Sequence, residues 1–131
     1  MRKDISVGGV IIPCVANAFT PILYRQIFRR DFMTEIQSFA KLKGKKVTEY
    51  TDEDKALAFE RTNSFAGLAF TMKEQATDKS VKDLVKLTEI DFYEWLTSFE
   101  PMAFEDVNTI TDILNLWRGN AEDNKVTAKN A

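Results

Sequence analysis

The sequence predicts a mainly α-helical fold, a small bundle of about five helices with a short N-terminal β-hairpin. Apolar residues recur at the three- and four-residue steps of a helix through most of the 131 residues. Serine, threonine and aspartate precede several of these segments, where their side chains can cap a helix start. A chain of this length can bury a core without metals or disulfides, so a single domain is expected over residues 1–119.

The hairpin is expected over residues 4–12, where two runs of β-prone residues flank a glycine pair. Gly8 and Gly9 can adopt the positive φ values that a two-residue turn needs. Pro13 is expected to end the second strand. Because an isolated hairpin is marginally stable in water, this one should pack on the helices or on a second copy.

Two helices are predicted in quick succession after the hairpin. Thr20 is the expected N-cap of the first, over residues 20–29, and Pro21 suits its first helical position. Asp31 is the expected cap of the second helix, over residues 31–42. Both segments place their apolar residues on one stripe, which should face the rest of the domain.

The longest helix is predicted over residues 52–76. Thr51 and Asp54 form a capping box at its start. Its apolar residues cover more than half of the helix circumference, so this helix should contact neighbours on two sides and form the centre of the domain. These residues are Leu57, Ala58, Phe59, Phe65, Ala66, Leu68, Ala69, Phe70, Met72 and Ala76.

The last part of the chain predicts two further helices, over residues 89–99 and 104–118, with Gly119 as the terminating residue of the second. The connection over residues 77–90 fits either a short helix or a short strand, because its apolar residues are too few to separate the two periodicities. Residues 120–131 are polar and lack aromatic side chains, so they are expected to form a disordered tail.

No catalytic, metal or cofactor site is expected from the sequence. The chain has no histidine, which excludes Ser-His-Asp and Cys-His relays and imidazole-bound zinc. The single cysteine, Cys14, allows no internal disulfide and should pack as a small buried residue. A two-carboxylate hydrolase is the remaining catalytic alternative, but each candidate acid has a helix-start explanation. These acids are Asp31, Asp52, Asp54, Asp83 and Asp91.

The net charge of −2 gives no global attraction to nucleic acid or to an anionic membrane. A basic cluster does occur, and a solvated face is favoured over a nucleic-acid site because no aromatic residues alternate with its charges. Its members are Arg25, Arg29, Arg30, Lys41, Lys43, Lys45 and Lys46. No apolar stretch approaches the roughly 20 residues of a membrane helix, so a soluble intracellular protein is expected.

Three segments carry a family resemblance. The first segment contains Thr20, Pro21, Tyr24, Phe28, Asp31 and Phe32. The second segment runs from Ala66 to Met72 and includes Gln75 and Ala76. The third segment consists of Trp95 and Leu96, followed later by Ile113, Leu114, Leu116, Trp117 and Asn120. In this order and spacing they resemble the tail assembly chaperones of long, non-contractile-tailed (siphovirus-type) bacteriophages and prophages of Gram-positive bacteria. The connection over residues 77–90 is longer than that family leads us to expect.

The resemblance implies a non-catalytic protein that binds the phage tape-measure protein and keeps it soluble. It also implies a role in recruiting tail-tube protein during virion morphogenesis, through a longer form made by a ribosomal frameshift. We further expect a homo-oligomer that acts in the host cytoplasm and is not part of the mature virion. The frameshifted form should diverge near Asn120 and leave the folded domain intact.

Partner-binding residues are expected among the apolar side chains that a small bundle cannot bury completely. The candidates are Tyr24, Phe28, Phe70, Met102, Phe104 and Leu116. The motif residues Thr20, Pro21, Tyr24, Phe28, Asp31, Trp95 and Trp117 are expected to be structural. Two alternatives stay open: a small intracellular regulatory module of phage or host that binds protein or nucleic acid, and an enzyme subunit that completes its site with a partner.

Overall fold

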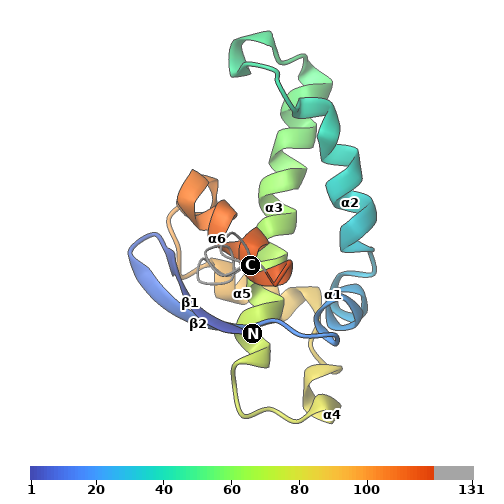
Figure 1. Ribbon diagram of the computed structural model, residues 1–131, viewed down its shortest axis with the longest axis vertical. Helices are drawn as coiled ribbons and strands as arrows, with labels where there is room; N and C mark the ends of the chain where they lie inside the picture. Colours follow the sequence, from blue (N-terminus) through green and yellow to red (C-terminus); the bar gives the residue numbers. More distant parts are fainter. Residues whose placement is uncertain (120–131) are drawn as a thin grey trace, which may run out of the picture.

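The computed structural model describes residues 1–119, and 61% of these residues are helical. Figure 1 shows a helical domain with one β-hairpin against it, so the predicted fold class is confirmed. The strands are β1 (Arg2–Val7) and β2 (Val10–Val15). The α-helices are α1 (Thr20–Phe28), α2 (Phe32–Ser38), α3 (Asp52–Gln75), α4 (Val81–Leu84), α5 (Glu89–Leu96) and α6 (Val107–Trp117). Short 3-10 turns occupy Phe39–Leu42, Val47–Glu49 and Ala103–Glu105.

The hairpin is longer than predicted, because β2 continues through Pro13 to Val15. Gly8 and Gly9 have φ values of 57° and 84°, as the two-residue turn requires. Hydrogen-bonded and non-hydrogen-bonded residue pairs alternate along the two strands, starting from this turn. Asp4 and Pro13 form a non-hydrogen-bonded pair. The nitrogen of Pro13 therefore faces the free edge of β2, where a missing N–H costs no ladder bond.

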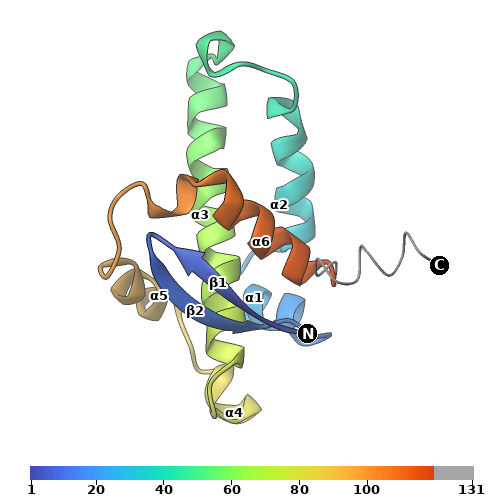
Figure 2. The ribbon, with the colours of Figure 1, turned by 60° about the vertical axis from the view of Figure 1, so that its left-hand side comes forward.

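The inner face of the hairpin packs on α3, and α6 lies along β1 (Figure 2). Ile5, Val7 and Cys14 on this face are fully buried. The Thr109 hydroxyl of α6 donates a hydrogen bond of 2.8 Å to the carbonyl oxygen of Ser6. Ser6 forms a non-hydrogen-bonded pair with Ile11, so its carbonyl points away from β2. Helix α6 therefore supplies a hydrogen bond to the free edge of β1. The hairpin is thus stabilised by the helices of its own chain.

Helix α3 is the centre of the domain, as its wide apolar arc predicted. Every residue from Ser64 to Met72 is buried, because β2, α1, α5 and α6 surround this half of the helix. The first half extends beyond the body of the domain and has α2 along one side (Figures 1 and 2). Phe59 lies in this first half, and its side chain is 76% exposed. Phe59 therefore belongs to the predicted apolar arc but does not lie in the core.

The predicted helix starts agree with the structure except at α1 and α6. Helix α6 begins at Val107, three residues later than predicted, because Asp106 caps it and Ala103–Glu105 form a separate 3-10 turn. Thr51 caps α3, and its hydroxyl accepts the Asp54 N–H at 3.1 Å. At α1 the N-cap is Phe19, one residue before the predicted Thr20. The Thr20 hydroxyl instead accepts the Asn17 N–H at 2.9 Å and donates to the Gln75 amide oxygen at 2.6 Å. This side chain thereby joins the start of α1 to the end of α3.

The C-terminal part of the described chain is helical with short connections. The segment over residues 77–90 contains the four-residue helix α4, which decides between the two predicted structures for this connection. Helix α5 ends at Leu96, three residues earlier than predicted, and turns lead from there to Ala103–Glu105. Gly119 follows α6 with a φ of 72°, as expected for a terminating glycine. The predicted disordered tail over residues 120–131 lies outside the described residues.

Candidate functional site

The structure places most of the predicted partner-binding residues in the core. Five of the six are at most 6% exposed: Tyr24, Phe28, Phe70, Phe104 and Leu116. Phe70, Phe104 and Leu116 were expected at the surface because they fall off the main apolar stripes, but the domain packs on several sides of α3 and buries off-stripe residues as well. Met102 is the exception, with 67% of its side chain exposed.

The motif aromatics form a continuous ring cluster inside the domain. The Tyr24 ring centroid lies 4.7 Å from that of Phe28 and 5.1 Å from that of Phe32. Phe32 meets Trp117 edge-on at 4.9 Å, and Phe28 meets Phe92 edge-on at 5.1 Å. Such edge-to-face pairs add to the apolar burial of the rings. The cluster joins α1, α2, α5 and α6, so these motif residues have structural contacts.

The other motif residues also have local structural surroundings. Trp95 is half-buried and lies 5.6 Å from Phe70, centroid to centroid. Asp31 caps α2 by accepting the Met33 N–H at 3.3 Å. Pro21 is exposed near the start of α1, where its fixed φ fits a helix. These three residues therefore have structural roles at their positions.

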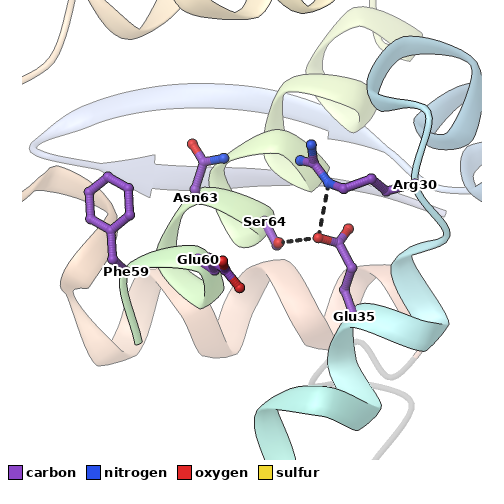
Figure 3. Close-up of a pocket in the computed structure, with 6 residues that line it drawn as sticks. All are labelled: Arg30, Glu35, Phe59, Glu60, Asn63 and Ser64. Atoms are coloured by element: carbon purple, nitrogen blue, oxygen red, sulfur yellow. Dashed lines mark hydrogen bonds and ion pairs between the residues drawn. The ribbon is translucent and has the colours of Figure 1, made fainter. Parts of the chain in front are cut away.

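A polar cluster around Glu35 is the most elaborate hydrogen-bonded group of the described chain. Its carboxylate accepts the Tyr24 hydroxyl at 2.7 Å, the Ser64 hydroxyl at 2.9 Å and the Arg30 Nε–H at 3.1 Å. Figure 3 shows Glu35 facing Arg30 and Ser64 from the opposite helix. The Arg30 guanidinium also reaches Glu89 at 3.4 Å. Burial and donation to Glu35 raise the pKa of the Tyr24 hydroxyl above its usual range.

The Glu35 cluster is suited to holding elements together. The Glu35 carboxylate joins α2 to α1, to α3 and to the turn after α1, and Arg30 extends the cluster to Glu89 of α5. The hollow beside it, bordered by Phe59, Glu60 and Asn63, has a volume of about 230 Å³. Small-molecule sites commonly have about 300–1,000 Å³. This hollow is therefore small for a metabolite.

A second buried charge lies near the end of α3. Glu74 is 3% exposed, and its carboxylate pairs with Lys73 at 2.6 Å and with Lys79 from the loop after α3. Burial alone would raise the pKa of Glu74, but the two ammonium groups outweigh it and lower the pKa from the ordinary 4.5. The arrangement fixes the loop to the helix.

Neither a metal-binding cluster nor a membrane-spanning helix is found among the described residues. Within residues 1–119, no three Cys, Asp or Glu side chains gather closely enough to hold a metal ion. Every buried side-chain nitrogen and oxygen in the same range has a hydrogen-bond partner. None of the described helices combines the length and apolar composition needed to cross a bilayer.

An apolar groove lies between the first half of α3 and the turns after α5. We define the α3–α5 groove by its five apolar lining residues, Phe59, Ala66, Leu96, Pro101 and Phe104. Its hollow has a volume of about 170 Å³, which fits a side chain or two better than a metabolite. Met102, beside its Pro101 wall, adds further exposed apolar surface. The sequence predicted Met102 and Phe104 as partner-binding residues but did not predict Phe59, Leu96 and Pro101.

The residue pattern contained a partial signal for this groove. Phe59 precedes Ser64, where complete burial of α3 begins, by more than one helical turn. Residues 52–63 of α3 contain six charged residues and residues 64–75 contain two, so the sequence indicated which half is more exposed. It did not indicate that Leu96, Pro101 and Phe104 line a hollow with Phe59. No protein-family model, curated protein or solved structure matches this chain significantly.

Proposed function

We propose that this chain is a non-catalytic tail assembly chaperone that binds the tape-measure protein of a siphovirus-type phage or prophage. Two observations support the proposal: the resemblance of the three sequence segments, and an exposed apolar groove on a helical domain. The groove is the observation that carries it, because a chaperone needs apolar surface that its own core does not use.

The groove suits a helical client in both size and chemistry. An amphipathic helix inserts successive apolar side chains into a hydrophobic groove, and the α3–α5 groove has space for such an anchor. A tape-measure protein is long and helical, so many copies of the chaperone should bind along it. Self-association of the chaperone would add avidity without any new contact to the client.

The test is co-expression with the candidate tape-measure protein, whose very long reading frame should lie downstream of this gene. We expect the candidate to stay soluble in a complex with many copies of this chain, measured by size-exclusion chromatography with light scattering. Truncation before Asn120 should leave the complex intact, because all five groove residues precede it. An insoluble candidate beside a freely eluting chain would contradict the proposal.

One observation favours a second candidate, a small regulatory module that binds nucleic acid. Arg25 on α1 and Arg29 directly after this helix are exposed, and Arg29 and Lys86 border a hollow of about 260 Å³ between α1 and the segment after α4. Binding through these cations would weaken steeply with salt. A salt-dependent shift of labelled DNA or RNA, lost in Arg25→Ala/Arg29→Ala, would support this module, and no shift is expected for a chaperone.

A further inference from the structure

The chemistry of the client segment can be inferred from the surroundings of the α3–α5 groove. We propose that the groove binds an amphipathic helix that inserts an apolar side chain and places Lys or Arg beside it. The inference rests on the proposed function for its biological client and adds which surface binds and which charge the client carries. Three properties of the groove support this proposal: a fixed floor, an exposed rim and carboxylates without an ion pair.

The floor of the groove is held by aromatic packing. The Phe104 ring centroid lies 5.6 Å from that of Trp95 and 5.3 Å from that of Phe99. Trp95 in turn packs on Phe70 of the central helix at 5.6 Å. Phe104 is 6% exposed and therefore fixed in position before any client arrives. A preorganised floor lowers the entropy cost of binding.

The rim, by contrast, is an apolar side chain in water. Phe59 is 76% exposed although it lines the hollow that Leu96 and Phe104 also line. A Phe ring in this position gains burial only when another apolar group covers it. Aromatic side chains that become fully buried at the centre of a protein interface are frequent hot spots. Phe59 is therefore the residue that should respond most to a bound helix.

The chain segment that carries Leu96, Pro101 and Phe104 has ionised side chains of one sign only. Residues 87–117 contain no lysine or arginine, although the whole chain has 18. The same segment contains seven acids: Glu89, Asp91, Glu94, Glu100, Glu105, Asp106 and Asp112. Two of them flank the groove in sequence, Glu100 before Pro101 and Glu105 after Phe104.

These flanking carboxylates are not used by the fold. Glu100 and Glu105 are exposed, as is Glu60 beside Phe59 on α3. Within residues 1–119, no ion pair involves any of the three. A partner with cations beside its apolar anchor would pair with them, whereas an acidic partner would be repelled. Charge complementarity thus selects a basic amphipathic helix as the occupant.

The experiment uses the full-length protein and a labelled synthetic helix. The probe is a peptide of about 18 residues, or five turns, with Leu on one stripe and Lys elsewhere. A matched peptide has Glu in place of every Lys, and fluorescence anisotropy measures the affinity of both. We expect the Lys peptide to bind, the Glu peptide to bind at least tenfold more weakly, and the Lys affinity to fall as salt rises.

Paired variants of the protein locate the binding surface. Phe59→Ser should weaken the Lys peptide by about tenfold or more, the size of a hot spot. Its control is Val47→Ser, which removes an equally exposed apolar side chain, 73% exposed, in the loop between α2 and α3. Both positions are at the surface, so both variants should fold. The control should change the affinity by less than about twofold.

A second pair separates local charge from net charge. Glu100→Lys/Glu105→Lys should weaken the Lys peptide about tenfold, whereas Asp4→Lys/Asp78→Lys makes the same change in net charge elsewhere and should have little effect. Equal binding of the two peptides, or no effect of Phe59→Ser, overturns the inference. It is also overturned if the protein self-associates and the groove variants dissociate it, because the occupant is then a second copy.

The inference and the proposed function can fail separately. If co-expression keeps the tape-measure candidate soluble and Phe59→Ser does so equally well, the chaperone function stands and the groove is not its binding surface. If the candidate stays insoluble but the Lys peptide binds with the stated variant pattern, the groove chemistry stands and the client is a different basic helix.

Discussion

The Phe28 ring lies directly against the backbone of Gly67, in the middle of α3. A Cβ added at Gly67 would stand 3.0 Å from Phe28 Cζ, closer than ordinary van der Waals contact. Phe28 is itself held by Tyr24 at 4.7 Å and by Phe92 at 5.1 Å, ring centroid to centroid. The absence of a side chain at Gly67 therefore sets how closely α1 packs on α3.

The first prediction is that Gly67→Ala destabilises the protein. Alanine would gain about 1 kcal/mol of helix propensity over glycine at an exposed site. Here the added methyl must displace a ring that cannot move freely, which costs about 1–3 kcal/mol. We expect a net loss of stability of about 1 kcal/mol, measured as a lower urea midpoint.

The Phe28→Leu background provides the control for this first prediction. Removing the ring should make Gly67→Ala neutral or stabilising, because the clash is gone and the propensity gain remains. A Gly67→Ala variant that is more stable than the parent would show that Phe28 can shift at low cost.

The second prediction concerns the hydrogen bonds to Glu35. Tyr24→Phe removes one donor at 2.7 Å and leaves Ser64 and Arg30 on the carboxylate, so it should cost about 0.5–1.5 kcal/mol. Glu35→Leu removes the acceptor of all three donors and leaves buried hydroxyls unpaired, which should cost about 2–4 kcal/mol. Urea denaturation of both variants measures the two losses of stability, which can then be compared. Equal losses would mean that the Tyr24 bond alone matters.

The helix starts show how much of the fold the sequence could predict. Thr51 and Asp54 predicted the start of α3 correctly, because a capping box is made by residues three apart. Thr20 has the same chemistry, yet its hydroxyl bonds to Gln75, 55 residues away, and Phe19 takes the cap position. Local patterns specify local bonds, and a distant partner can redirect the same side chain.

The candidate site was less predictable than the fold. Phe59 and Phe70 both belong to the apolar arc of α3, but one is 76% exposed and the other 2%. The difference arises because β2, α1, α5 and α6 pack on the second half of the helix and leave Phe59 open. Pro13 shows the same limit in a strand, since its effect depends on whether its nitrogen faces a partner strand. In both cases the outcome depends on the elements that pack around the residue.

The third prediction concerns Glu74 and its dependence on pH. The folded protein lowers the pKa of Glu74 from 4.5, so ionised Glu74 stabilises the fold above that value. This stability should be lost as the pH falls through the lower pKa of the folded state. Glu74→Gln should therefore cost about 1–3 kcal/mol at neutral pH and progressively less below about pH 4.5.

The third prediction is tested by comparing the urea midpoints of the parent and of Glu74→Gln at neutral pH and at about pH 4. Glu94→Gln is the matched control, because Glu94 is exposed and its side chain makes no ion pair within residues 1–119. This control should change the midpoint little at either pH. A Glu74→Gln penalty that stays constant with pH would mean that shape, and not charge, accounts for it.

The last prediction is that Cys14 reacts only when the protein opens. Its side chain is fully buried on the inner face of β2, and burial, with a smaller effect of Asp4, raises the pKa of the thiol to about 12. Since the thiolate is the reactive form, native labelling with a thiol reagent near neutral pH should be very slow. The chain has one cysteine, so all labelling reports this site, and Cys14→Ser gives the blank. If the hairpin opens with the whole domain, the free energy from labelling equals that from urea denaturation. A much smaller labelling free energy would instead show that β2 detaches from α3 while the helices stay folded.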